Sequence, residues 1–170
     1  MKTIGTYFNI IQGHQITDEE LYKTDGKIPV FTGSNDVKGY WNKTLIKEED
    51  LPCITYPTKG NKEGNVFVQH KIFDANNTAV LVPKDEWREK INLEWFAFKF
   101  KHVLQMIQTS KENVSYLNRD LVEPHEFDIP DIEVQLKELE PIKKLKAMRK
   151  KLSLAIDKID KILDKSVTYD

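Results

Sequence analysis

The sequence predicts an α+β fold, in which a globular domain with a mixed or antiparallel sheet and packed helices precedes one long C-terminal α-helix that forms a coiled coil. Short apolar runs alternate with turn residues through the first 90 positions, which favours strands and small helices. From residue 133 to about residue 165 there is no glycine and Pro141 is the only proline, which favours one continuous helix. We therefore expect a globular domain over residues 1–130 and a spacer and dimerisation helix over residues 131–170.

Local signals place the elements of the globular domain. Thr17 and Glu20 have the spacing of a capping box, which opens a short helix that ends near Lys23. Asn92 can cap a second helix that runs to about Gln108 and is apolar on most sides, so it should pack within the domain. The expected extended segments are 7–11 (or a short helix), 28–31, 51–56, 66–68, 78–82 and 121–129. Pro130 marks the boundary with the long helix.

The long helix carries an apolar stripe with the spacing of a coiled coil. Its members recur at alternating steps of three and four residues, and they are Leu145, Met148, Leu152, Ala155, Ile159 and Ile162. A helical stretch of about 25 to 30 residues reaches roughly 40 Å, which is longer than the compact domain can cover. The stripe therefore predicts that the chain docks a partner helix.

Charge and composition limit the function classes. The formal net charge of −1 argues against a strong autonomous nucleic-acid binder. Basic residues nevertheless gather on the long helix, where residues 137–165 hold ten Lys or Arg against five Asp or Glu. A solvated helix face explains this excess, and so does contact with an acidic partner or with a phosphate backbone.

The sequence contains no membrane span and no sign of export. Its apolar runs are too short to cross a bilayer, and its first residues lack the apolar core of a signal peptide. Cys53 is the only cysteine, which suits a reducing compartment, and it stands in a strand-like run where we expect it to pack in the core. We therefore expect a cytoplasmic protein.

No catalytic or metal-binding pattern stands out. The sequence has no glycine-rich phosphate loop, no dinucleotide fingerprint and no methyltransferase cofactor loop. The magnesium-binding pattern of many nucleases is also missing around Asp74, Asp85 and Glu86. The histidines have no partner at a spacing of three or four residues, which favours structural or surface roles for His14, His70, His102 and His125. We also expect Trp87 and Trp95 to pack in the core or against a helix.

Two polar loops could read another surface. The first contains Lys59, Asn61, Lys62 and Asn65 around two glycines. Asparagine can pair bidentately with adenine, and lysine can reach guanine or a phosphate. The second loop spans residues 33–41 and contains Lys38, Tyr40 and Trp41. Ordinary turns between strands are the other interpretation of both loops, and Trp41 can equally pack in the core.

The order of these segments resembles one target-recognition domain of a type I restriction–modification specificity subunit. The resemblance covers nearly the whole chain, and it departs from the usual Ile-Pro-x-Pro form at residues 129–132. In the domain it rests on Ile28–Ser34, Gly39–Trp41, Ile54–Thr55 with Gly60–Val66, and Phe73–Leu81. At the junction it rests on Leu117–Leu121, Phe127–Ile132 and Gln135, which lead into a long Lys/Glu-rich helix.

This resemblance implies a non-catalytic DNA sequence-specificity subunit. Such subunits hold two recognition domains apart with two antiparallel helices, so this chain is similar to a half-subunit that forms an antiparallel homodimer and reads a gapped site. Methyltransferase subunits would bring S-adenosylmethionine, a restriction and motor subunit would bring ATP and Mg²⁺, and this chain would bind no cofactor. The residues that would contact double-stranded DNA are Lys38, Tyr40, Trp41, Lys59, Asn61, Lys62 and Asn65.

Two alternatives remain open. The chain could be a coiled-coil assembly module without DNA readout, because a lone apolar stripe also suits that role. It could also be the recognition chain of a fused type II enzyme of the IIB or IIG kind, since that difference lies in the partner. The sequence does not specify the DNA target or the length of its gap.

Overall fold

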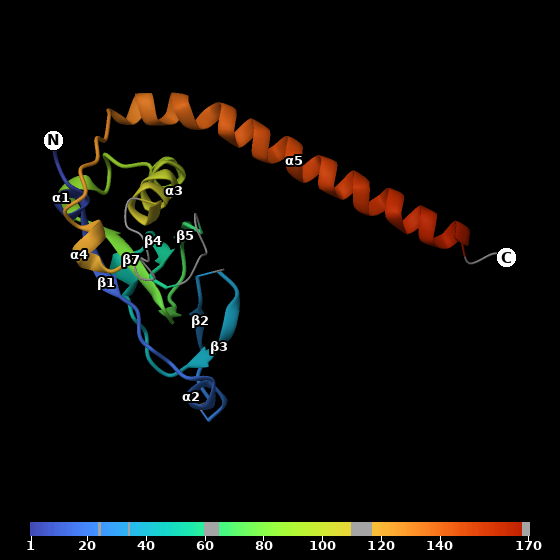
Figure 1. The fold of residues 1–170 in the computed structure, drawn as a ribbon, viewed down its shortest axis with the longest axis horizontal. Helices are drawn as coiled ribbons and strands as arrows, with labels where there is room; N and C mark the ends of the chain where they lie inside the picture. Colours follow the sequence, from blue (N-terminus) through green and yellow to red (C-terminus); the bar gives the residue numbers. More distant parts are fainter. Residues whose placement is uncertain (24, 34, 60–64, 110–116, 168–170) are drawn as a thin grey trace.

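A computed structural model describes residues 1–23, 25–33, 35–59, 65–109 and 117–167. These residues form a head of two sheets with packed helices, from which one long helix projects (Figure 1). The α+β class predicted from the sequence is therefore confirmed.

The larger sheet lies at the centre of the head. Its strand order is β1-β7-β4-β5, and all of its pairs are antiparallel. The central strand β7 is buried along its whole length, and its Leu81 pairs with Ile10 on one side and Ile54 on the other. The strands are β1 (Phe8–Gln12), β4 (Cys53–Pro57), β5 (Phe67–Gln69) and β7 (Thr78–Pro83).

A second, smaller sheet has the order β3-β2-β6 and contains a parallel pair between β2 and β6. It consists of β2 (Ile28–Phe31), β3 (Val37–Trp41) and β6 (Asp74–Ala75). The sequence had placed residues 33–41 in one loop, which is wrong for its second half. Residues 37–41 pair along β2, with Trp41 opposite Ile28, because valine and aromatic residues favour a pleated surface.

The predicted helix caps are present. The Thr17 hydroxyl accepts a hydrogen bond from the Glu20 amide at 3.3 Å, and the Glu20 carboxylate accepts one from the Thr17 amide at 2.8 Å. The Asn92 side chain accepts from the Trp95 amide at 3.1 Å. The helices are α1 (Ile4–Tyr7), α2 (Asp18–Tyr22), α3 (Leu93–Thr109), α4 (Arg119–Val122) and α5 (Ile132–Val167), with 3₁₀ turns η1 (Glu48–Asp50) and η2 (Asp85–Trp87).

The predicted extended stretch 121–129 is wrong at its start, where helix α4 extends to Val122. The side chain of Asn118 caps this helix by accepting from the Leu121 amide at 3.3 Å. Asparagine followed by polar residues is a helix-start signal, and one short turn is enough to satisfy it.

Helix α3 covers one face of the larger sheet and makes the main core. Phe96 and Phe100 stack at 5.3 Å between ring centroids, and they contact Phe8 of β1 and Tyr56 of β4 respectively. Trp95 is buried, and the half-buried Trp87 packs edge-on against Tyr7, as the sequence predicted for both tryptophans.

The first turns of α5 are fixed to the head. Gln135 is fully buried, and its amide nitrogen donates to the carbonyl oxygens of Lys90 and Pro130, each at 2.7 Å. Its amide oxygen accepts from the Asn92 amide at 2.8 Å. One side chain therefore joins the start of α5, the start of α3 and the segment before each of them.

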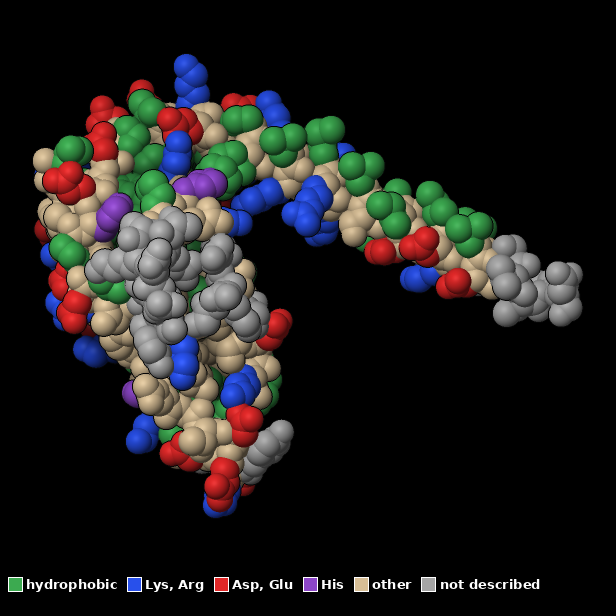
Figure 2. Space-filling model, viewed as in Figure 1, with side chains coloured by type: hydrophobic (Ala, Val, Ile, Leu, Met, Phe, Trp, Pro, Cys, Tyr) green, Lys and Arg blue, Asp and Glu red, His purple; other side chains and the backbone are tan. Residues whose placement is uncertain are grey.

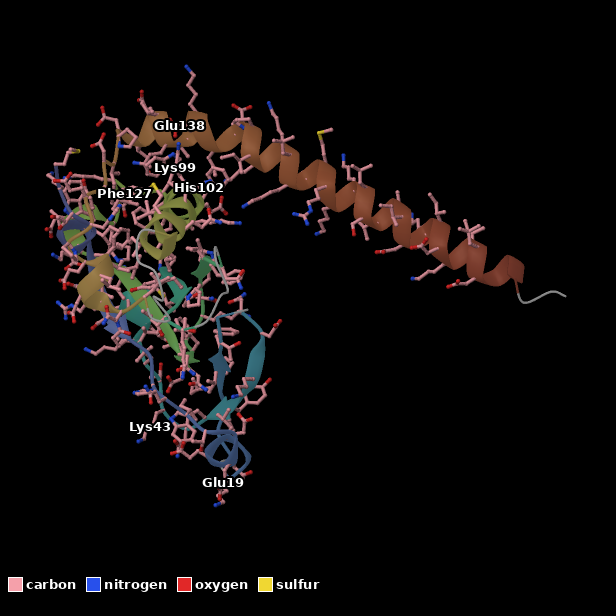
Figure 3. All side chains as sticks on the ribbon, viewed as in Figure 1. Glu19, Lys43, Lys99, His102, Phe127 and Glu138 are labelled. Atoms are coloured by element: carbon pink, nitrogen blue, oxygen red, sulfur yellow. The ribbon has the colours of Figure 1, made fainter. Side chains whose placement is uncertain are left out.

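A second contact fixes the next turn of α5. The Glu138 carboxylate lies 2.9 Å from the Lys99 ammonium and accepts from the Trp95 indole at 2.8 Å (Figure 3). These hydrogen bonds, the one from Lys99 first, hold the pKa of Glu138 below its usual value. Leu139 beside it lies in the head's core.

Beyond Ile142, α5 leaves the head. Every residue from 143 to 164 is exposed. The whole helix has 36 residues, so it is longer than the sequence estimate, and it extends for about 54 Å at 1.5 Å per residue. Pro141 lies inside it, where the missing amide and the ring are the ordinary cause of a bend, and α5 changes direction after its first turns (Figure 1).

Among the described residues, no helix combines the length and the hydropathy that crossing a membrane requires.

Candidate nucleic-acid interface

The turn between β2 and β3 lies beside the end of β4, where the other polar loop begins. Gly33, at the turn between β2 and β3, packs on Pro57, at the end of β4. A Cβ atom built on Gly33 would lie only 2.7 Å from the Cβ atom of Pro57, so a larger residue does not fit there without a shift. The close approach of the two backbones therefore depends on glycine.

A hydrogen-bonded bridge reinforces this contact. The side chain of Gln69, at the end of β5, donates to the side-chain oxygen of Asn35 and to the Thr55 hydroxyl, the latter at 3.0 Å. Asn35 has a φ of 62°, a left-handed conformation that asparagine tolerates. Gln69 thus ties the β2–β3 turn to both strands that flank the other loop. We call this arrangement the Gln69 bridge.

The base of the loop after β4 is also fixed. The Thr58 amide donates to the Asn77 carbonyl at 3.0 Å, and the Thr58 carbonyl accepts from the Leu117 amide at 2.8 Å. Two further chain segments therefore hold the start of this loop in place. A fixed base suits recognition, because the described start of the loop does not have to be ordered on binding.

The predicted contact residues differ in their surroundings. Lys59 is exposed at the loop base, and Asn65 is half-buried where the chain returns to β5. Tyr40 is 53% exposed on β3, and Lys38 on the same strand is paired with Asp18 of α2. Asn61 and Lys62 lie outside the described residues.

Trp41 occupies a packed position. It contacts the small cluster of Ile16, Leu21 and Val30, and the Lys43 ammonium lies 6.0 Å from its ring centroid (Lys43 is labelled in Figure 3). Its indole nitrogen is buried and has no hydrogen-bond partner among the described residues. These contacts favour the alternative that Trp41 packs in the core.

The described residues contain no cluster of three or more potential metal ligands. His14 does have a partner that its position in the sequence did not reveal. Its Nδ1 atom lies 2.9 Å from a carboxylate oxygen of Asp74, which is fully buried and also accepts from the Ala75 amide at 2.7 Å. The histidine therefore has a structural partner, as the sequence argument favoured.

Cys53 is fully buried, and burial raises the pKa of its thiol to about 12. Below pH 9 its thiolate fraction is therefore roughly a thousandfold lower than that of an exposed cysteine. At pH 8 we expect the Cys53 thiol of the folded protein to react with a disulfide reagent only at the rate at which unfolding exposes it. The thiol of the denatured chain should react within the mixing time. Fast reaction of the folded protein would contradict the core position of Cys53.

A groove lies between the head and the inner side of α5. It has a volume of about 810 Å³, and β5, α3 and α5 line it. Four of its lining residues are cations, Lys101, Lys143, Lys146 and Arg149, whereas Glu94 is its one acid. Figure 2 shows basic side chains on this side of α5 next to the head. We call it the basic groove. The basic cluster is visible in the sequence, but the side of the helix that faces the head is not.

The predicted apolar stripe of α5 is exposed to solvent. Leu145, Leu152 and Ile159 are 65%, 63% and 55% exposed, and Ala155 is exposed too. At 100° per residue the stripe lies roughly 150° around the helix from the basic groove. Figure 2 accordingly shows hydrophobic side chains along the side of α5 that faces away from the groove.

Comparison with known proteins identifies the fold. No family model and no curated protein matches the sequence. Three solved structures align with 90–96% of the chain, over both the head and the long helix. The fold is that of type I specificity subunits.

The likeness is structural, since sequence identity is low. The type I restriction–modification S subunit from M. genitalium matches with a TM-score of 0.63 at 19% identity, and the HsdS subunit from Thermoanaerobacter tengcongensis with 0.65 at 14%. A chain from a study of complex assembly and conformational transition of the type I R-M system matches with 0.68 at 16%. This chain covers 43%, 38% and 42% of those chains respectively, or about two fifths of each.

Proposed function

We propose that this chain is a DNA sequence-recognition subunit of a type I-like restriction–modification system and is itself without catalytic activity. The observation that carries the proposal is the structural match to type I specificity subunits, which includes the head and the projecting helix together. A match to the head alone would leave the long exposed helix unexplained.

In this proposal the two tied loops read DNA. Lys59, Asn65 and the residues between them would enter the major groove, and Tyr40 and Lys38 would lie beside them on β3. Lysine and asparagine are suited to this task because they reach guanine and adenine edges. The Gln69 bridge supports the proposal, since it holds the two loops as one surface.

The exposed stripe of α5 would pair with that of a second copy. Residues 142–151 hold six basic residues and no acid, whereas residues 157–164 hold three acids and two bases. A parallel pair would bring the two basic stretches together. An antiparallel pair instead places each basic stretch near the more acidic end of its partner, which is electrostatically favourable. Such a twofold dimer puts the heads at opposite ends and would read a palindrome with a gap.

The reactions would belong to partner subunits. Methyltransferase subunits would dock on the dimer with S-adenosylmethionine, and a restriction and motor subunit would supply ATP and Mg²⁺ chemistry, all in the cytoplasm.

The test is co-expression with methyltransferase subunits from the same genome, followed by methylation sequencing of the host DNA. The expected result is a new methylation mark at a gapped palindrome that disappears when this chain is omitted. A stable complex that leaves no new mark would favour an assembly module without DNA readout. If the methyltransferase and nuclease prove to be one polypeptide, the recognition role stands and the system is of the fused type II kind.

A loop variant should separate reading from assembly. We expect the triple change Lys59→Ala, Asn61→Ala and Lys62→Ala to abolish the methylation mark, because it removes the donors that would contact the bases in this proposal. Co-purification with the methyltransferase should persist. The matched control changes Lys47, an exposed lysine beside η1 that pairs with Glu49, to alanine and should leave the mark intact. Methylation by the triple variant at the wild-type motif would show that other residues read the site.

A further inference from the structure

We infer that the basic groove between the head and α5 binds the phosphate backbone of the DNA beside the site that the loops read. This inference rests on the proposed function and adds a second DNA contact, which is independent of sequence. One of the four cations that line the groove is in an ion pair, which leaves three basic side chains for a ligand. Lys143 pairs with Glu94 at 2.7 Å, and no carboxylate ion pair to Lys101, Lys146 or Arg149 occurs in the described part of the chain.

The position of the groove connects it to the loops. Its wall on the head side includes Val66, Phe67 and Val68, which follow Asn65 directly in the chain. A DNA strand in contact with the loop after β4 can therefore continue along β5 into the groove.

The spacing and the charge of the basic side chains in the groove suit one strand of DNA. Of the cations outside that ion pair, Lys146 and Arg149 are three residues apart, which is about 4.5 Å along the helix. Successive phosphates of one strand advance by about 3.4 Å along the duplex, so these two cations match two neighbouring phosphates. Lys101, on α3, faces the same strand from the opposite wall.

The groove and the dimer stripe are compatible. They lie roughly 150° apart around α5, so a helix that pairs through the stripe leaves the groove open. One helix can therefore hold the dimer together on its outer side and DNA on its inner side.

The test is binding of the full-length protein to a mixed-sequence duplex, measured by fluorescence anisotropy over a range of salt concentrations. The double variant Lys101→Ala/Lys146→Ala removes one cation from each wall. We expect its affinity at low salt to fall on the order of tenfold, and the slope of log K against log salt to fall by about 2, because each lost phosphate contact removes about one counterion. The control Lys158→Ala/Lys161→Ala removes two cations farther along the helix and should change neither quantity.

Unchanged affinity and salt slope in the double variant would overturn the inference, and so would a wild-type protein that does not bind the duplex at low salt. Loss of methyltransferase co-purification with normal DNA binding would overturn it as well, since the groove would then dock an acidic protein surface. These outcomes are distinct from failure of the proposed function, which is judged by the methylation motif. A motif found together with an unaffected double variant would reject the groove alone.

Discussion

Replacing Leu152 by aspartate is expected to convert a dimer into monomers. Leu152 is 63% exposed in the single chain and lies in the middle of the apolar stripe, so pairing would bury it. An unpaired carboxylate in that position costs several kcal/mol in each copy, which is enough to dissociate a helix pair. Sedimentation equilibrium gives the mass directly. Circular dichroism should show that the head remains folded, because α5 leaves the head before this position.

The matched control for this prediction is Leu154→Asp. Leu154 is 54% exposed, but it lies about 160° around the helix from Leu152, away from the stripe. This variant should remain dimeric. If Leu152→Asp stayed dimeric while Leu154→Asp dissociated, the pairing surface would lie on the other side of α5.

Replacing Gln135 by leucine is expected to lower the free energy of unfolding by about 3 kcal/mol. The change leaves the Lys90 and Pro130 carbonyls and the Asn92 backbone amide without their partner, and a polar group left unsatisfied costs about 1–3 kcal/mol when it is buried, and less when water can reach it. Urea denaturation followed by tryptophan fluorescence would measure the loss, at a fixed protein concentration because the proposed dimerisation would also contribute to stability.

Two further variants test the origin of this effect. Lys137→Leu adds the same side chain at an exposed position two residues away and should change stability by less than 0.5 kcal/mol. Gln135→Glu keeps the acceptor for the Asn92 amide but loses both donors, so it should still be strongly destabilised. A loss below 1 kcal/mol for Gln135→Leu would mean that water replaces the side chain.

Several local signals in the sequence were informative, although the cap at Asn118 and the strand over residues 37–41 were missed. The capping box at Thr17, the cap at Asn92 and the buried strand around Val80 each depend on residues a few positions apart, and each is present in the structure. The coiled-coil stripe is equally local, because it needs only the helical repeat. It identified an exposed face without any knowledge of the head.

Contacts between distant residues could not be predicted in this way. His14 and Asp74 are 60 positions apart, and Asn35 and Gln69 are 34 apart. In neither pair does the sequence around one residue predict its contact with the other. The basic groove depends in the same way on the direction in which α5 leaves the head, to which the hydrogen bonds of Gln135 and Glu138 and the bend at Pro141 contribute.

Under the proposed function, the Gln69 bridge has a consequence for how the protein could acquire a new DNA target. Because Gly33 lies against Pro57 and Asn35 is hydrogen-bonded to Gln69, the β2–β3 turn and the base of the loop after β4 are mechanically coupled. A substitution at Gly33 or Asn35 would disturb this contact, in which neither Lys59 nor Asn65 takes part, and a β2–β3 turn grafted from a relative would have to keep both Gly33 and Asn35. Under the proposed function, substitution within the loop after β4 and exchange of the whole head are therefore the routes to a new specificity that leave the bridge intact.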